Sequence, residues 1–279
     1  MNSAQQLRAL VAAPEILVTP GVYDTFSAFR AQEAGFRAVF VSGSALAAMH
    51  LGRPDVGLLT LTETAEIVGR ISERIDIPLF VDADQGFGNA MSVGRSVTLL
   101  ERAGAAGIQI EDQQEVKQVS DALSRPLVAP QVMVGKIRAA LDSRRDDATM
   151  ISARSDAMSS EGFDRALERA HLYVDAGADM VFVESLKTRA QMERLAAELG
   201  PKVPLLHNLL RADDEVREAA TVQQIGYNVA LFPGAAVSAV GQALDDAFAG
   251  LMARPEITAN GPASDRIGAA EYLAQFKPE

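Results

Sequence analysis

The 279-residue chain contains no cysteine and no tryptophan, and only 5% of its residues are aromatic. Without cysteine there can be no disulfide, no thiolate metal site and no thiol nucleophile. No apolar run approaches the roughly 18 residues that a membrane-spanning helix needs. Residues 1–13 lack the basic start and long apolar core of a signal peptide. These absences predict a soluble, cytoplasmic enzyme.

Positive charge is also scarce, because the formal net charge is −11. This excess of acid argues against nucleic acid or an anionic membrane as a partner. It does not exclude an anionic small molecule, because a local arginine and a bound metal can reverse the field inside a pocket. The hydrophobic content of 48% supports a large core. No linker of low complexity divides the chain, so we predict a single domain over residues 1–279.

Apolar segments of strand length alternate with segments of helical pattern along the chain. The segments are apolar nearly throughout, which is typical of parallel strands covered by helices. The predicted strands span residues 16–19, 38–42, 79–82, 107–111, 149–153, 180–184, 203–207 and 228–232. The predicted helices lie near residues 24–34, 62–74, 90–103, 132–142, 164–176, 189–199, 213–225 and 235–249.

A glycine closes four of these helices a few residues before the next strand, at Gly35, Gly104, Gly177 and Gly226. Glycine supplies the left-handed conformation that often ends a helix. The repeat of eight strand–helix units favours a closed (β/α)8 TIM-type barrel over an open sheet. Residues 252–279 follow the last predicted helix, and we expect them to form a C-terminal helical extension with a role in oligomerisation.

Residues 78–88 read Pro-Leu-Phe-Val-Asp-Ala-Asp-Gln-Gly-Phe-Gly, an apolar run that ends in two acids and then glycines. Alternation along a strand places Asp82 and Asp84 on one face. Two such carboxylates repel each other unless a cation or a shared proton relieves them. Mg²⁺ usually takes one or two protein carboxylates and keeps several waters. The alternative interpretation is a pair of acids that cap the next helix.

Polar residues follow the other predicted strands as well. In a barrel, the C-terminal ends of the strands converge on one mouth, which carries the chemistry. Acids after the third, fourth and sixth strands and an arginine after the fifth favour a metal and an anion in one pocket. The residues at these ends are Ser42, Gly43, Ser44, Asp82, Asp84, Glu111, Asp112, Arg154, Asp156, Glu184, His207 and Asn208.

Three of these positions have competing interpretations. Residues 42–44 offer either backbone N–H groups to a carboxylate or oxyanion, or a simple turn. Arg154 suits bidentate recognition of a carboxylate, and its alternative is an ion pair with Glu184 or Asp112. Neighbours on a strand face opposite ways, so we expect Asn208 rather than His207 to point inward.

Taken together, these motifs resemble the isocitrate lyase and phosphoenolpyruvate mutase superfamily. The similarity covers nearly the whole chain in order, and its most specific part is Asp-Ala-Asp-Gln-Gly-Phe-Gly. The matching segments are residues 20–24, 41–44, 52–55, 81–89, 110–113, 153–156 and 183–185. The resemblance implies a barrel whose last helix is exchanged with a neighbouring subunit, in a homotetramer of paired dimers. It also implies a small 2-oxo or 2-hydroxy carboxylic acid substrate bound with Mg²⁺, or alternatively Mn²⁺.

The resemblance also implies roles for individual residues. Asp84 would ligate the metal, while Asp55, Asp82 and Glu111 would hold its waters. The predicted metal residues are therefore Asp82, Asp84 and Glu111, and the predicted substrate-binding residues are Ser42, Gly43, Ser44, Arg154 and Asn208. The candidate catalytic residues are Asp55, Lys117, Arg154 and Glu184.

The chain departs from the superfamily pattern in the loop after the fourth strand. Members that cleave isocitrate or methylisocitrate carry Lys-Arg-Cys-Gly-His, and phosphonate-processing members carry Lys-Thr-Asn-Ser. Residues 117–121 here read Lys-Gln-Val-Ser-Asp, and valine cannot transfer a proton. A third group lacks the cysteine and decarboxylates oxaloacetate, in which CO₂ leaves as a neutral molecule.

This departure favours a magnesium-dependent carbon–carbon lyase that acts on a 2-oxo dicarboxylate through an enolate, with oxaloacetate as the first substrate to test. Three alternatives stay open. They are cleavage of the P–C bond of phosphonopyruvate, methylisocitrate-type cleavage with a different acid, and non-catalytic binding of a dicarboxylate.

Overall fold

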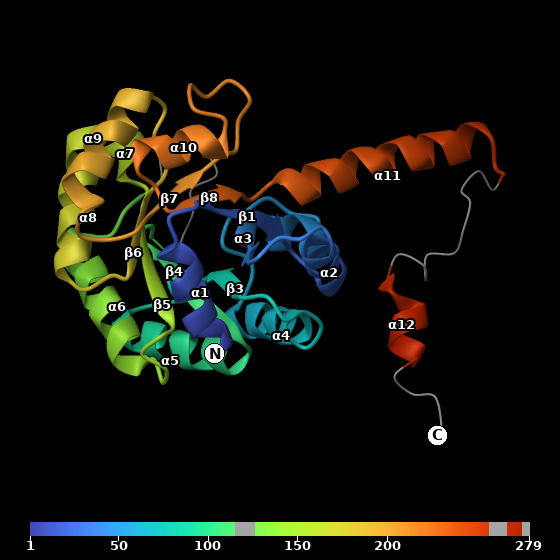
Figure 1. Cartoon of the computed structure of the whole chain (residues 1–279), viewed down its shortest axis with the longest axis horizontal. Helices are drawn as coiled ribbons and strands as arrows, with labels where there is room; N and C mark the ends of the chain where they lie inside the picture. The colour runs from blue at the N-terminus through green and yellow to red at the C-terminus, as the bar shows by residue number, and fades with distance from the viewer. Residues whose placement is uncertain (115–125, 257–266, 275–279) are drawn as a thin grey trace.

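Eight parallel strands close into a barrel in chain order in the computed structural model, which describes residues 1–114, 126–256 and 267–274 (Figure 1). Each predicted strand overlaps one of them, and the predicted (β/α)8 TIM-type fold is confirmed. The strands are β1 (Leu17–Val22), β2 (Val39–Val41), β3 (Leu79–Asp82), β4 (Ala105–Glu111), β5 (Met150–Ser155), β6 (Met180–Val183), β7 (Leu205–Asn208) and β8 (Val229–Phe232).

Helices cover the outside of the barrel (Figure 1). The eight helices that alternate with the strands as predicted are α2 (Thr25–Glu33), α4 (Leu61–Ser72), α5 (Ala90–Arg102), α6 (Pro130–Ser143), α8 (Phe163–Asp175), α9 (Arg189–Leu199), α10 (Ala219–Ile225) and α11 (Ala235–Ala253). The remaining ones are α1 (Ser3–Val11), α3 (Gly43–Leu46), the π-helix η1 (Ala47–Leu51), α7 (Ala157–Ser160) and α12 (Ala269–Ala274). Within the described residues, no helix is long and apolar enough to cross a membrane.

Two helix boundaries differ from the predictions. α10 begins at residue 219 rather than near 213, because the preceding residues form a loop at the mouth of the barrel. α11 continues to residue 253, so the predicted extension at 252–279 begins inside this helix rather than after it. The four predicted helix-ending glycines are confirmed, with positive φ angles of 90° at Gly35, 106° at Gly104, 101° at Gly177 and 110° at Gly226.

The strands are apolar nearly throughout because both of their faces are buried. One cluster lies inside the barrel, where the rings of Phe40 and Phe80 meet edge to face at 5.2 Å. Leu7 and Leu10 of α1 join this cluster beside residues near the N-terminal ends of the strands. A larger cluster fills the space between the strands and the outer helices. The N-terminal end is therefore filled with apolar side chains, which leaves the opposite mouth for chemistry.

Candidate active site

A cavity of about 570 Å³ lies at the C-terminal ends of the strands. Its wall combines the predicted residues from β2, β3, β5, β6 and β7 with the loops that follow these strands. The predicted residues in the wall are Ser42, Ser44, Asp55, Asp82, Arg154, Glu184 and Asn208. Lys117 lies outside the described residues. A second depression, of about 650 Å³, lies between α5 and α6 on the outside of the barrel and contains none of the acids at the strand ends.

Asp82 and Asp84 come together around Gly43. The Gly43 N–H donates to Asp82 Oδ2 at 3.3 Å, and the Asp84 N–H donates to Asp82 Oδ1 at 3.2 Å. A Cβ atom at position 43 would lie 3.2 Å from Asp82 Oδ2 and 3.7 Å from Asp84 Oδ1. The glycine therefore lets the backbone approach both carboxylates closely.

The backbone at Asp84 is not the extended strand that simple alternation assumes. β3 ends at Asp82, and Asp84 has a φ of 46°, in the left-handed region that residues other than glycine rarely occupy. Hydrogen bonds on both sides hold this conformation, from the Ala83 N–H to the Gln109 carbonyl and from the Glu111 N–H to the Asp84 carbonyl, both at 2.9 Å. Backbone strain of this kind is concentrated at functional sites.

Arg154 lies among three carboxylates. Its Nε is 3.0 Å from Asp156 Oδ2 and 3.3 Å from Glu111 Oε2, and its Nη2 is 2.9 Å from Asp156 Oδ1 and 3.4 Å from Glu184 Oε2. Burial by itself would lower the pKa of Arg154, but these carboxylates hold that pKa well above its ordinary value. One guanidinium therefore faces three acids, and the ion pair with Glu184, which is the alternative interpretation of Arg154, is present.

The arrangement of acids at this mouth fits a hard divalent cation. Asp82, Asp84 and Glu111 bring oxygen donors only, and Arg154 balances only part of the local negative charge. Across the described ranges, no three acidic or histidine side chains form a complete set of metal ligands. Mg²⁺ does not require one, since it commonly binds one or two carboxylates and retains waters. The pair Asp82–Asp84 would hold such an ion, with Glu111 beside it.

Two of the three amides at residues 42–44 already have acceptors, and the hydroxyl groups of the two serines lie at the cavity. The Ser42 N–H donates to the Val22 carbonyl at 3.2 Å, and the Gly43 N–H donates to Asp82. The hydroxyls of Ser42 and Ser44 lie 3.1 Å apart, and both residues line the cavity. Ser42 also caps α3, a short helix that the sequence pattern did not reveal.

Both residues at the end of β7 line the cavity, although the sequence predicts that only Asn208 does so, and they differ in their contacts. The Asn208 Nδ2 donates to Glu184 Oε2 at 3.3 Å, on the cavity side of Arg154. The imidazole of His207 is buried and packs edge to face against the Tyr227 ring at 5.7 Å. Burial lowers the pKa of His207 from 6.5 to about 4.

Sequence reasoning missed two cations in the cavity wall, Lys187 and Arg211. They belong to the loops after β6 and β7, where no periodic pattern constrains the backbone. Both side chains are exposed. Within the described part of the chain, neither makes an ion pair.

A (β/α)8 barrel with polar and charged residues at its C-terminal mouth is the arrangement of an enzyme site for a small molecule. The chain belongs to the phosphoenolpyruvate phosphomutase family, whose model matches residues 7–252. The resemblance to the phosphoenolpyruvate mutase and isocitrate lyase superfamily is thereby confirmed.

Two curated relatives are carbon–carbon lyases by name. The chain is 44% identical to a probable 2-methylisocitrate lyase of Corynebacterium glutamicum, over 86% of this chain and 79% of the relative. It is 38% identical to the 2,3-dimethylmalate lyase of Eubacterium barkeri, over 90% and 86% respectively. The expectation of a lyase of this superfamily is therefore confirmed.

Solved structures show the same barrel. Oxaloacetate acetylhydrolase in complex with 3,3-difluorooxalacetate matches with a TM-score of 0.92 and 27% identity, over 98% of this chain and 96% of that one. Phosphonopyruvate hydrolase in complex with oxalate and Mg²⁺ matches with a TM-score of 0.86 and 27% identity, over 98% of both chains.

The buried imidazole of His207 predicts a pH effect on stability. Between pH 6.5 and 4 the unfolded chain binds a proton at this residue while the folded chain does not. The free energy of unfolding therefore falls as the pH decreases through this window. We expect His207→Gln to remove up to roughly 3 kcal/mol of that fall, measured by denaturant unfolding at both ends of the window.

Tyr227→Phe is the matched control, because it changes the same buried ring pair and keeps the imidazole. It should change the free energy of unfolding by a similar amount at both pH values. If the wild type and His207→Gln lose stability in parallel from pH 6.5 to 4, the buried neutral imidazole is not the cause.

Proposed function

We propose that this chain is a Mg²⁺-dependent lyase that acts on a small 2-oxo or 2-hydroxy dicarboxylic acid through a pyruvate-enolate-like intermediate, with decarboxylation of oxaloacetate favoured. One observation carries the proposal. The paired carboxylates at Gly43 and the arginine at the end of β5 belong to the same mouth of the barrel. A cation and an anionic substrate can therefore meet there.

The chain's own residues have distinct tasks in this proposal. The hydroxyls of Ser42 and Ser44 donate hydrogen bonds to the carboxylate next to the 2-oxo group. Arg154, held by Asp156 and Glu184, keeps its guanidinium beside the reacting end of the substrate. Bound Mg²⁺ would supply positive charge to the oxygen on which the enolate charge develops. Asp55, which also lies in the cavity wall, would orient water.

The missing cysteine decides which bond we expect to break. When oxaloacetate loses CO₂, the C3–C4 bond breaks, its electron pair stays on the pyruvate enolate, and water can protonate C3 later. No protein acid is needed to expel the neutral CO₂. The structural similarity to an oxaloacetate acetylhydrolase supports oxaloacetate as a ligand of this cavity. Lys117 remains a proposed catalytic residue from the sequence alone.

A second candidate is cleavage of a branched malate or isocitrate of the kind named for the curated relatives. The observation that favours it is the identity of 44% and 38% to a probable 2-methylisocitrate lyase and a 2,3-dimethylmalate lyase. This reaction needs an acid to protonate the departing fragment, and residues 117–121 offer no cysteine for that step.

The charge of the cavity wall supports a substrate with two carboxylates. Arg154 is already engaged by three acids, so it cannot neutralise both ends of a dicarboxylate. Lys187 and Arg211 lie in the wall on the loops after β6 and β7. We assign them to the carboxylate that is distant from the 2-oxo group.

Asp84→Asn tests the proposed metal dependence. Asparagine tolerates the left-handed backbone and has the same shape, so the variant should fold and lose only the negative charge. We expect the release of pyruvate from oxaloacetate to fall roughly hundredfold or more, as for other losses of electrostatic stabilisation. Isothermal titration should show weaker binding of Mg²⁺ in the presence of oxalate, which resembles the enolate of pyruvate.

Asp76→Asn is the matched control, because Asp76 is an exposed aspartate outside the cavity. Free Mg²⁺ decarboxylates oxaloacetate slowly, so all rates are compared at the same free metal concentration. Full activity and full metal affinity of Asp84→Asn would contradict the proposal. Turnover of 2,3-dimethylmalate or 2-methylisocitrate, but not of oxaloacetate, would instead select the second candidate.

Arg211→Gln tests the assignment of the distant carboxylate. Loss of a charge-assisted contact should raise the KM for oxaloacetate about tenfold without lowering kcat, because the distant carboxylate loses its charge as it leaves as CO₂. The affinity for oxalate should not change, because oxalate has no distant carboxylate. Arg217→Gln is the control, since Arg217 lies in the same loop but outside the cavity wall. Equal effects on oxaloacetate and oxalate would reject the assignment.

We further propose that the chain is a homotetramer of paired dimers in which α11 is exchanged between subunits. α11 extends away from the barrel in Figure 1, and none of its residues is buried. Leu244, Phe248, Leu251 and Met252 are 44%, 60%, 54% and 86% exposed. Their spacing places them on one face of the helix, which a partner would cover.

Phe248→Asp tests this assembly. A charge in the middle of the apolar face should lower the molar mass measured by light scattering from that of a tetramer to a smaller species. Gln242→Asp is the control, because residue 242 lies about 120° around α11 from Phe248 and should leave the mass unchanged. A monomeric wild-type chain would contradict the proposed tetramer.

A further inference from the structure

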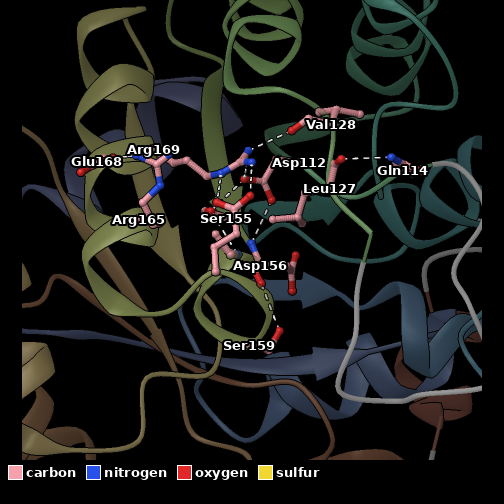
Figure 2. A network of polar contacts seen from close by, with 12 residues as sticks. Asp112, Gln114, Leu127, Val128, Ser155, Asp156, Ser159, Arg165, Glu168 and Arg169 are labelled. Atoms are coloured by element: carbon pink, nitrogen blue, oxygen red, sulfur yellow. Dashed lines mark hydrogen bonds and ion pairs between the residues drawn. The ribbon is translucent and has the colours of Figure 1, made fainter.

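A buried polar cluster lies behind Arg154, on the side away from the cavity. Figure 2 shows its centre, the carboxylate of Asp112, which is 0% exposed. Asp112 Oδ2 accepts hydrogen bonds from Tyr173 Oη at 2.7 Å and Ser155 Oγ at 2.8 Å, and Arg169 Nη1 lies 3.4 Å away. We call Asp112, Arg169 and Tyr173 the rear cluster. None of the three lines the cavity.

The rear cluster is connected to Arg154 through the backbone at the end of β5. Asp112 Oδ1 accepts the Asp156 N–H at 2.9 Å, and the Asp112 N–H donates to the Arg154 carbonyl at 3.2 Å. The Asp156 carboxylate in turn holds the Arg154 guanidinium through Nε and Nη2. A shift of Asp112 would therefore move both the backbone and the main carboxylate partner of Arg154.

The same cluster is connected to the chain that returns to the barrel after β4. The Val128 N–H donates to the Asp112 carbonyl, and Arg169 Nη1 donates to the Val128 carbonyl, both at 2.9 Å (Figure 2). Gln113 and Leu127 form an antiparallel bridge, and the Gln114 N–H donates to the Pro126 carbonyl at 2.8 Å. Residues 126–128 are thus held by the Asp112 backbone and by Arg169, which also contacts the carboxylate that aligns Asp156.

Helix α8 supplies the charge that makes this arrangement stable. Arg169 and Tyr173 are one helical turn apart on α8, and both side chains are buried. Glu161 binds Arg169 through two hydrogen bonds of 2.8 and 2.7 Å, which fixes the direction of the guanidinium. A buried carboxylate without such partners would carry a large desolvation cost.

We propose that Asp112, Arg169 and Tyr173 are positioning residues that hold Arg154 in its binding geometry and keep residues 126–128 in register with it. The role of Arg154 toward the substrate rests on the proposed function. The connection between the rear cluster and Arg154 does not rest on the proposed function, because it consists of hydrogen bonds to Asp112 that can be tested without a substrate.

Tyr173→Phe and Arg169→Gln test the proposal. Both remove a partner of Asp112 at a distance from the cavity, and Tyr173→Phe does so with the smaller change in packing. We expect amide hydrogen exchange at Asp156 to become at least tenfold faster, since this amide donates to the Asp112 carboxylate. Exchange at Val128 should become faster as well, since its amide donates to the Asp112 backbone carbonyl and its own carbonyl accepts from Arg169. We expect kcat/KM for oxaloacetate to fall about tenfold to a hundredfold, as for other small displacements of substrate-positioning groups. Arg169→Lys should restore part of that loss.

Arg194→Gln is the matched control. Arg194 makes comparable ion pairs with Asp164 and Glu198, but it is exposed and does not contact Asp112. It should change neither the exchange at Asp156 nor kcat/KM. Oxalate affinity in the presence of Mg²⁺, measured on folded protein, separates positioning from stability and should weaken in Tyr173→Phe and Arg169→Gln but not in Arg194→Gln.

Two results would overturn the proposal. One is unchanged exchange at Val128 and Asp156 in folded Tyr173→Phe and Arg169→Gln. The other is faster exchange with unchanged oxalate affinity and unchanged kcat/KM. If wild-type protein neither converts oxaloacetate nor binds oxalate, the proposed function fails, and hydrogen exchange alone decides whether the rear cluster holds Asp156.

Discussion

Concentrated negative charge at one mouth of the barrel is the constraint on which the site depends. Glu111, Glu184 and Asp156 converge on the single guanidinium of Arg154, and two more carboxylates meet at Gly43 a short distance along the rim. Acids so close together are costly unless cations offset them. Arg154 supplies one positive charge, which offsets only part of the negative charge of these carboxylates. The negative charge that remains suits this mouth to a divalent cation.

The fold makes this accumulation of charge tolerable. The barrel interior is filled with apolar side chains toward the N-terminal ends of the strands, and a second apolar layer lies between strands and helices. Polar atoms are therefore concentrated at the opposite mouth, where the strands end and hydrogen-bonding loops begin. The rear cluster adds a further buried charge next to this mouth. Its aspartate, Asp112, is stabilised by Arg169 and Tyr173 of α8.

The comparisons with known proteins indicate the family of the chain, while the absence of cysteine bears on which bond is broken. Identity to named lyases places the chain in a family of enzymes that share this barrel. The bond that is broken depends on a few residues, and the absence of cysteine from the whole chain removes one acid that a related reaction would use. Fold similarity alone does not define a function, because the side chains of the site determine both the reaction and the substrate.

Much of this architecture could be predicted from local patterns. Apolar runs of strand length, helix-ending glycines such as Gly104, and acids directly after the runs determined the barrel and the mouth at which chemistry collects. These features are readable because burial on both faces and left-handed helix ends each demand a particular residue type at a particular place. The resemblance to the superfamily then predicted roles for individual residues in metal and substrate binding, which hydrophobic periodicity cannot indicate.

Other features were decided only by tertiary contacts. Asp84 lies beyond the strand in a left-handed conformation, yet its carboxylate meets Asp82 because Gly43 of another loop leaves room for both. Asp112 follows Glu111 directly, but it turns away from Arg154 toward helix α8, some sixty residues later in the chain. The sequence determined which residues stand at the strand ends. Which of them face the cavity, and which are held behind it, depended on partners distant in the chain, because a hydrogen bond or an ion pair is set by distance in space.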